Sequence, residues 1–173
     1  MALTLEAAGK VRQKAYSALL NSDRGTTTGA GSTAAFYALK AFFLWWSSNK
    51  SNADLQFIPF SNITSADPGI AQNTGYSPIA GVTSTVHFLW ARNDGTGDGT
   101  DSFISLHNST TNTNVDLAYV TGLISDDNDS FFFVSIPGIV FATDLTISAA
   151  TTNGGQTESA AANAANGFVI VAA

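Results

Sequence analysis

The sequence predicts a mainly β protein, an antiparallel β-sandwich of jelly-roll type with an N-terminal α-helical arm. Beyond residue 54, short runs rich in β-branched and aromatic residues alternate with turns of Gly, Asn, Asp and Ser. Before that point, apolar residues recur at helical spacing. The 173 residues contain no cysteine, and a chain of this length can bury one core without disulfides. We expect residues 1–33 to form a helix and flexible arm, and residues 34–173 to form the sandwich domain.

Residues 3–21 are predicted to form an amphipathic helix. Apolar side chains recur at helical intervals, and Glu6 and Lys10 are spaced for an i, i+4 ion pair. Much of the apolar stripe is alanine, so we expect the helix to dock against a neighbouring element or a partner chain. The following Gly/Thr/Ala stretch, residues 25–33, is typical of a flexible linker or extended arm.

Residues 34–46 are apolar on every face. Their content of Ala and Leu favours a buried helix, capped by Ser32 or Thr33, over a strand. The run includes Lys40 and is shorter than the roughly 20 residues that span a bilayer, so no membrane span is predicted. Its six aromatic rings favour a core or a subunit seam over a ligand platform.

The remaining chain reads as short strands separated by turns. Strands are predicted at residues 54–60, 81–91, 102–107, 114–121, 130–136, 138–148 and 167–172, with a possible edge strand near 69–80. So many strands with so little helix between them favour an antiparallel sandwich and exclude a parallel α/β fold.

Hydrophobic matching predicts a register for one hairpin, between residues 82–91 and 102–108. Phe88 then faces Leu106, Trp90 faces Ile104, and His87 lies directly across from His107. Two facing histidines could bind a transition metal, but no third ligand falls nearby. We therefore expect a surface or interface pair without a metal.

Two acidic turns could attract a cation. Residues 93–101 are rich in Asp, Thr and Gly, which suits calcium, but their spacing matches neither the EF-hand nor the β-helix repeat. A mobile hairpin tip is favoured there, and the same holds for Asp126, Asp127 and Asp129. No cofactor is predicted.

Catalytic motifs are missing from the sequence. It contains no G-x-S-x-G, no H-E-x-x-H and no phosphate loop, and no lysine follows Lys50. The acids cluster in Gly/Asn-rich turns, whereas tuned acid/base pairs usually lie in drier clefts. We expect a protein that is not an enzyme, with no catalytic, cofactor-binding or metal-binding residues.

Charge is sparse and uneven. Charged residues are 12% of the chain and apolar ones 45%, a balance that suits close packing against other proteins. Lys10, Arg12, Lys14 and Arg24 lie in the first 24 residues, whereas Arg92 is the only cation after Lys50 and faces eleven acids. Such an acidic body argues against nucleic-acid binding by the main domain, although the basic N-terminal segment could contact an acidic protein surface or nucleic acid. A solvated helix face is the simpler interpretation of that segment. No secretory signal is visible at the N-terminus.

The whole chain resembles small virion proteins of tailed bacteriophages, in particular capsid cement or decoration proteins. The resemblance is carried by an initiating Met, a short basic helix, a Thr/Gly arm and a cysteine-free, Ser/Thr/Asn-rich β body that ends in GFVIVAA. It implies a jelly roll or related sandwich that trimerises or bridges capsomers, with an N-terminal arm reaching across the shell. No site residue is carried over, because no motif is shared.

Taken together, these features predict a structural virion protein, made in the host cytoplasm and located on the capsid surface. Its expected partners are the major capsid protein and further copies of itself, with a trimer favoured. The alternative is a receptor- or carbohydrate-binding module of a phage head or tail fibre, using exposed aromatics such as Tyr76 or Tyr119.

Overall fold

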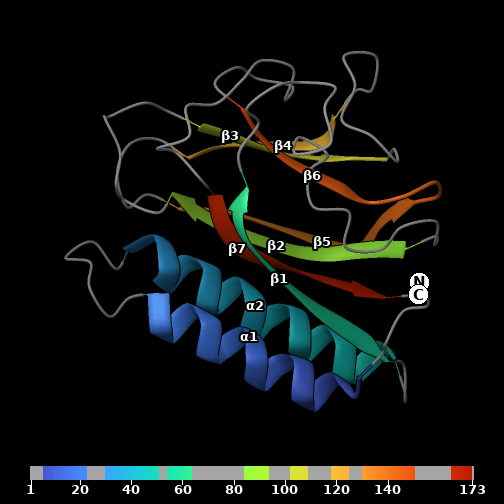
Figure 1. Cartoon of the computed structure of the whole chain (residues 1–173). Helices are drawn as coiled ribbons and strands as arrows, with labels where there is room; N and C mark the ends of the chain where they lie inside the picture. Colours follow the sequence, from blue (N-terminus) through green and yellow to red (C-terminus); the bar gives the residue numbers. More distant parts are fainter. Residues whose placement is uncertain are drawn as a thin grey trace.

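A computed structural model describes residues 6–22, 30–50, 54–63, 84–93, 102–108, 118–124, 130–150 and 165–172. Two helices lie on one face of a four-stranded sheet, and a three-stranded sheet covers its other face (Figure 1). The helices are α1 (Ala8–Ser22) and α2 (Ala30–Asn49). The strands are β1 (Leu55–Ile63), β2 (Ser84–Asn93), β3 (Ser102–His107), β4 (Ala118–Ile124), β5 (Ser130–Phe141), β6 (Thr146–Ala150) and β7 (Ala165–Ala172).

The strands form an antiparallel sandwich, which confirms the predicted fold class. The order is β1-β7-β2-β5 in one sheet and β4-β3-β6 in the other, and every named pair of strands is antiparallel. A jelly roll has eight strands. The eighth, expected near residues 69–80, lies outside the described residues.

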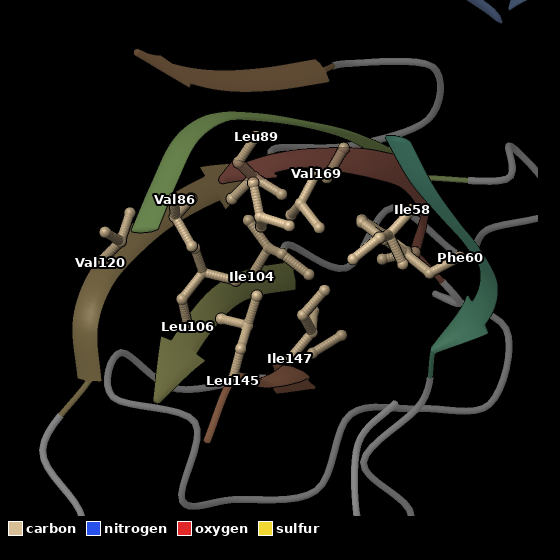
Figure 2. Packing of buried hydrophobic residues seen from close by; sticks show 14 of the residues in the cluster. Ile58, Phe60, Val86, Leu89, Ile104, Leu106, Val120, Leu145, Ile147 and Val169 are labelled. Atoms are coloured by element: carbon tan, nitrogen blue, oxygen red, sulfur yellow. The ribbon is translucent and has the colours of Figure 1, made fainter. Parts of the chain in front are cut away.

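Two hydrophobic cores hold the layers together. The first lies between the sheets, where side chains such as Val86, Ile104 and Val169 converge (Figure 2). The second lies between the helices and the four-stranded sheet and includes Phe42 and Phe168. Successive side chains of a strand point to opposite faces, so the central strands β2 and β7 must be apolar on both sides.

Both predicted helices are present, and the second confirms the preference for helix over strand. It begins at Ala30, so the expected domain boundary between residues 33 and 34 lies within α2, and the predicted linker overlaps its first turn. Residues 23–29 lie outside the described part of the chain. Helix α1 is also not an arm that stands apart from the sandwich, because Val11, Ala15 and Leu19 are buried in the second core.

Residues at the start of α1 tie it to the sheet. Glu6 forms an antiparallel bridge with Leu55, in which each backbone N–H donates to the other residue's carbonyl. The Glu6 carboxylate forms an ion pair with Lys14. The expected pair was with Lys10, one turn closer along the helix. The helix therefore enters its first turn already attached to β1.

Within the described residues, the strand predictions were correct except that one strand was divided at the wrong place. Residues 130–136 and 138–148 were expected as two strands, yet β5 continues through Pro137 and Gly138 to Phe141, and β6 begins at Thr146. The chain continues because Gly138 adopts a φ of 119°, which glycine tolerates. Pro137 and Gly138 lie in a bulge opposite His87 instead of ending the strand.

The predicted hairpin register was wrong. Strand β2 pairs with β5 and β7, whereas β3 pairs with β4 and β6, so the two strands belong to different sheets. Phe88 and Trp90 pack beneath the helices, while Ile104 and Leu106 pack between the sheets. Hydrophobic matching failed because both faces of β2 are buried, and a strand of that kind matches several neighbours equally well.

Candidate functional site

The two histidines do not form a pair. His87 stacks against Phe42 of α2, on the helix side of its sheet. On β3, Ile104 and Leu106 point into the core between the sheets, so alternation places His107 on the outer face of the other sheet. The facing pair that could have held a metal is therefore absent.

His87 is enclosed by aromatic rings. Its ring centroid lies 5.3 Å from that of Phe42, 6.2 Å from Trp45 and 5.1 Å from Trp46. Its Nδ1 lies 3.3 Å from the carbonyl oxygen of Ser135 in the β5 bulge, and because a carbonyl only accepts, Nδ1 is the donor. Only 2% of the residue is exposed. A side chain so enclosed holds α2 and β5 together and cannot reach a substrate.

Burial dominates the acid–base behaviour of His87. Desolvation lowers the pKa of the imidazole, the hydrogen bond to Ser135 partly opposes this, and the positive charge of Lys50 lowers the pKa further. The ring therefore favours its neutral form. Sequence reasoning missed this site because its rings come from α2, far away in the chain.

His107 has a polar neighbour on the next strand. Its Nε2 lies 3.0 Å from the Ser148 hydroxyl of β6, and both side chains are buried. The pair links β3 to β6 across the sheet. Such a buried imidazole–hydroxyl contact is typical of a structural role.

Of the other candidate site residues, some lie in the described part of the chain and others do not. Asn93 is the last residue of β2, while the rest of the 93–101 loop, the Asp126–Asp129 turn and Tyr76 lie outside the described residues. Tyr119 is half exposed, and its hydroxyl accepts a 3.1 Å hydrogen bond from Asn108. Among the described residues, no group of three or more His, Cys, Asp or Glu side chains could hold a metal ion.

The helical layer carries almost all of the described positive charge. Lys10, Arg12 and Lys14 lie on α1, Lys40 lies on α2 and Lys50 follows it, and all five are exposed. Arg92 on β2 is the sixth described cation. Positive charge is thus concentrated on one outer side of the molecule.

Two hollows border α1. One, of about 400 Å³, lies between the start of α1 and the end of α2. Its lining includes the cations Arg12 and Lys50, the aromatic Trp46 and the acidic Asp54. The other, of about 690 Å³, runs between α1 and β1 and is lined by Lys10, Lys14, Phe57 and Pro59. Cations with adjoining apolar surface suit contact with a partner that presents carboxylates.

Comparison with known proteins does not identify relatives of this chain. No family model matches the chain, and no curated protein or solved structure is significantly similar to it. Within the described residues, no helix is long and apolar enough to cross a membrane. The function is therefore inferred from the basic helical layer and from the hollows beside α1.

Proposed function

We propose that this protein is a structural component of a virion that binds the capsid surface and stabilises the shell by bridging major capsid subunits. The resemblance to phage cement and decoration proteins suggests the setting. The folded chain adds a suitable means of attachment, a basic face backed by a rigid sandwich. The proposal assigns the protein a contact function in place of a catalytic one.

The observation that carries the proposal is the separation of charge by layer. Residues 1–50 contain six Lys and Arg against two acids, whereas residues 51–173 contain one cation, Arg92, against eleven acids. The fold places α1 and α2 together on one face of the four-stranded sheet. A molecule charged in this way orients itself on an acidic surface with its helices inward.

An acidic protein surface fits this face better than nucleic acid does. Binding to a phosphate backbone requires many cations, and affinity falls steeply with each one lost. Here Lys14 is already paired with Glu6, and the rest of the chain is strongly acidic. The hollows beside α1 also offer apolar side chains such as Phe57, which suit a protein partner.

The strand order supports the jelly-roll form of the sandwich as part of this proposal. In the order β1-β7-β2-β5 and β4-β3-β6, consecutive strands often lie in opposite sheets, as they do in a jelly roll. The edge strand expected near residues 69–80 lies outside the described residues.

The proposal is tested by removing exposed charges that lie outside the core and measuring how well the variant binds capsid shells. Lys10→Gln with Arg12→Gln removes two exposed cations from α1. Each exposed ion pair contributes about 0.2–1 kcal/mol, so we expect loss of two cations to weaken binding to shells of the major capsid protein about twofold to thirtyfold in a cosedimentation assay at low salt.

A matched control changes the charge by the same amount on the β body. Ala142→Glu with Thr143→Glu adds two negative charges at exposed positions after β5. We expect this variant to bind shells as the unmodified protein does. Equal binding by all three proteins would contradict the proposal, and so would tighter binding to duplex DNA than to shells.

A further inference from the structure

The outer side of α2 carries a line of exposed side chains at heptad spacing. Its members follow one another at intervals of three and four residues: Ala34, Tyr37, Ala41, Leu44 and Ser48. Residues spaced in this way lie one above the other on a single face of a helix. All five are exposed, and the two large ones, Tyr37 and Leu44, are 64% and 62% exposed. We call these five residues the α2 stripe.

The α2 stripe lies opposite the buried side of the helix. The buried side chains that pack toward the four-stranded sheet are also three or four residues apart: Ala35, Leu39, Phe42 and Trp46. With about 3.6 residues per turn, the two lines fall on opposite sides of α2. A helix that is apolar on both sides is normally buried on both sides. The fold covers one side of α2 and leaves the other for a partner.

Helix α1 presents a different outer surface. Its exposed positions are mostly polar or charged, and they include Lys10, Gln13, Lys14 and Ser17. Among the described residues of α1, Leu20 is the only large hydrophobic side chain that is exposed. The apolar part of the helical layer's outer surface is therefore concentrated on α2.

Positive charge borders the α2 stripe on the flank that faces α1. Phe36 and Phe43 of α2 contact the ring of Tyr16 on α1. Lys40 lies between those two residues on the same side of the helix. Ser47 continues this side into the hollow of about 400 Å³, which adds two further cations. Neither helix contains an Asp or Glu to offset this charge.

We infer that the α2 stripe docks one amphipathic helix of the shell protein. The partner helix packs an apolar line of its own on the stripe and presents carboxylates to the flank that carries Lys40. This inference rests on the proposed function, because it specifies which surface of the acidic partner the helical layer binds.

A helix is the partner that heptad spacing fits. Apolar residues that repeat every 3.5 positions pack between the side chains of a second helix with the same repeat. A strand would instead match side chains two residues apart. From Ala34 to Ser48 the stripe is about 21 Å long at about 1.5 Å per residue, which accommodates one partner helix of about four turns.

Charge argues against a second copy of this chain as the occupant. Two copies joined through their α2 stripes would bring two basic helical layers together, with no Asp or Glu on α1 or α2 to offset them. A shell helix that carries carboxylates replaces this repulsion with attraction. Because the cations lie on one flank of the stripe, its carboxylates are expected on the flank that faces Lys40.

Lysine substitutions in the stripe separate apolar packing from charge. Tyr37→Lys and, separately, Leu44→Lys add a positive charge to a face that attracts acidic surfaces, so charge alone would tighten binding. Docking instead buries the new ammonium group against apolar side chains, which is costly. We expect cosedimentation with shells of the major capsid protein to weaken about tenfold or more, with an unchanged circular dichroism spectrum because both positions are exposed.

Leu20→Lys is the matched control. It makes the same substitution at a position of α1 that is 60% exposed and lies outside the α2 stripe. This variant should bind shells at least as well as the unmodified protein. A loss as large as that of Leu44→Lys would overturn the inference, because the stripe would then have no special part in binding.

The charged flank is tested by reversing one charge. Lys40→Glu should weaken shell binding about threefold at low salt, and the difference should shrink at high salt, where ions screen exposed charges. The loss caused by Leu44→Lys should persist at high salt. Unchanged binding by Lys40→Glu at low salt would contradict the placement of carboxylates beside this residue.

Cross-linking identifies the partner segment, and the absence of native cysteine allows single labels. A short photoreactive group is attached to Ala34→Cys or to Ser48→Cys, one at each end of the stripe. On shells, the two cross-links mapped by mass spectrometry should fall on one segment of the shell protein roughly 14 residues apart, whereas a strand would place them about six apart.

The outcomes distinguish this inference from the proposed function. If the unmodified protein does not bind shells, the proposed function fails and the inference falls with it. If shells are bound but both lysine variants bind equally well, only the inference fails. Cross-links at strand spacing, on scattered segments or on a second copy of this chain would also overturn the inference while leaving shell binding in place.

Discussion

A single extra residue in β2 lies next to His87. The register of β2 against β7 shifts by one residue between Val86 and Phe88, so His87 and Phe88 both turn toward the helices. The extra residue turns Phe88 toward the helices, whereas alternation from Val86, which lies in the core between the sheets, already directs the imidazole toward the helices. The aromatic side chains of α2 then surround it.

The buried imidazole should make stability depend on pH. Its pKa is lowered in the folded protein, so below about pH 6.5 the unfolded chain binds this proton more readily. The free energy of unfolding should therefore be unaffected by His87 above about pH 7 and fall below about pH 6.5, by at most about 1.4 kcal/mol per pH unit. The decline ends once the pH is below the folded pKa.

Denaturant titrations between pH 5 and pH 7.5 measure this effect when the protein is compared with His87→Phe. The variant keeps an aromatic ring among Phe42, Trp45 and Trp46 but carries no titratable group. Its free energy of unfolding should fall less steeply with decreasing pH. Identical slopes for the two proteins would show that His87 is not the group responsible.

Gly138 should tolerate no side chain. Its φ of 119° is strained for other residues, and an added Cβ would come within 2.5 Å of Thr85 and 2.7 Å of His87. Strain of this kind costs about 1–3 kcal/mol before the steric clash is counted. We expect Gly138→Ala to lower the free energy of unfolding by at least about 2 kcal/mol in urea titrations.

Gly9 provides the control for that substitution. A Cβ there meets nothing within 4 Å, and the residue lies in the first turn of α1. Gly9→Ala should be neutral or stabilise the protein by up to about 1 kcal/mol. A similar loss of stability in both variants would argue against a special role for the β5 bulge.

Helix α1 is an integral layer of the fold. Its first turn is attached to β1 through Glu6, and Leu19 is only 1% exposed. Much of its buried stripe is alanine, so two larger residues, Val11 and Leu19, supply much of the stabilisation. The sequence predicted that this helix would dock but left open whether it docks on its own domain or on a partner.

Adjacent leucines on α1 test this docking. Leu19→Ala should lower the free energy of unfolding by about 2–5 kcal/mol because it leaves a cavity beneath the helix. Leu20→Ala, at a position that is 60% exposed, should change it by less than about 0.5 kcal/mol. Equal and small effects in thermal or denaturant unfolding would mean that α1 is detached in solution.

For the whole molecule, the helical layer covers one face of the main sheet. Phe88, Trp90, Phe168 and Ile170 of that sheet are buried beneath it. Removing α1 exposes part of this surface as well as the inner face of α2. The basic segment is therefore both the proposed docking face and part of the core, and attachment is better tested with surface substitutions than with truncation.

Deleting residues 1–31 should consequently destabilise the β body. Loss of the buried Val11 and Leu19 alone removes about 3–6 kcal/mol of burial, a large part of the 5–15 kcal/mol that typically holds a domain folded. We expect a clearly lower melting temperature by circular dichroism and binding of a hydrophobic dye. An unchanged melting temperature would restore the idea of an independent arm.

Local patterns in the sequence determined much of this protein. Alternation and turn residues located the strands, helical spacing located α1, and the unequal charge of the two parts of the chain was visible from the start. These features depend on residues close together in the chain, whose preferences act whatever the rest of the chain does. For the same reason the end of one strand was misplaced at Pro137 and Gly138, where tertiary pairing with β2 carries β5 through a bulge.

Only the tertiary structure decided which elements meet. Side chains on both faces of β2 are buried, so its pattern suited β3 as well as its true neighbours β5 and β7. His87 likewise acquired its environment from α2 and from the β5 bulge, both distant in the chain. A hydrophobic pattern specifies that a face is buried, whereas its partner depends on how all the layers pack together.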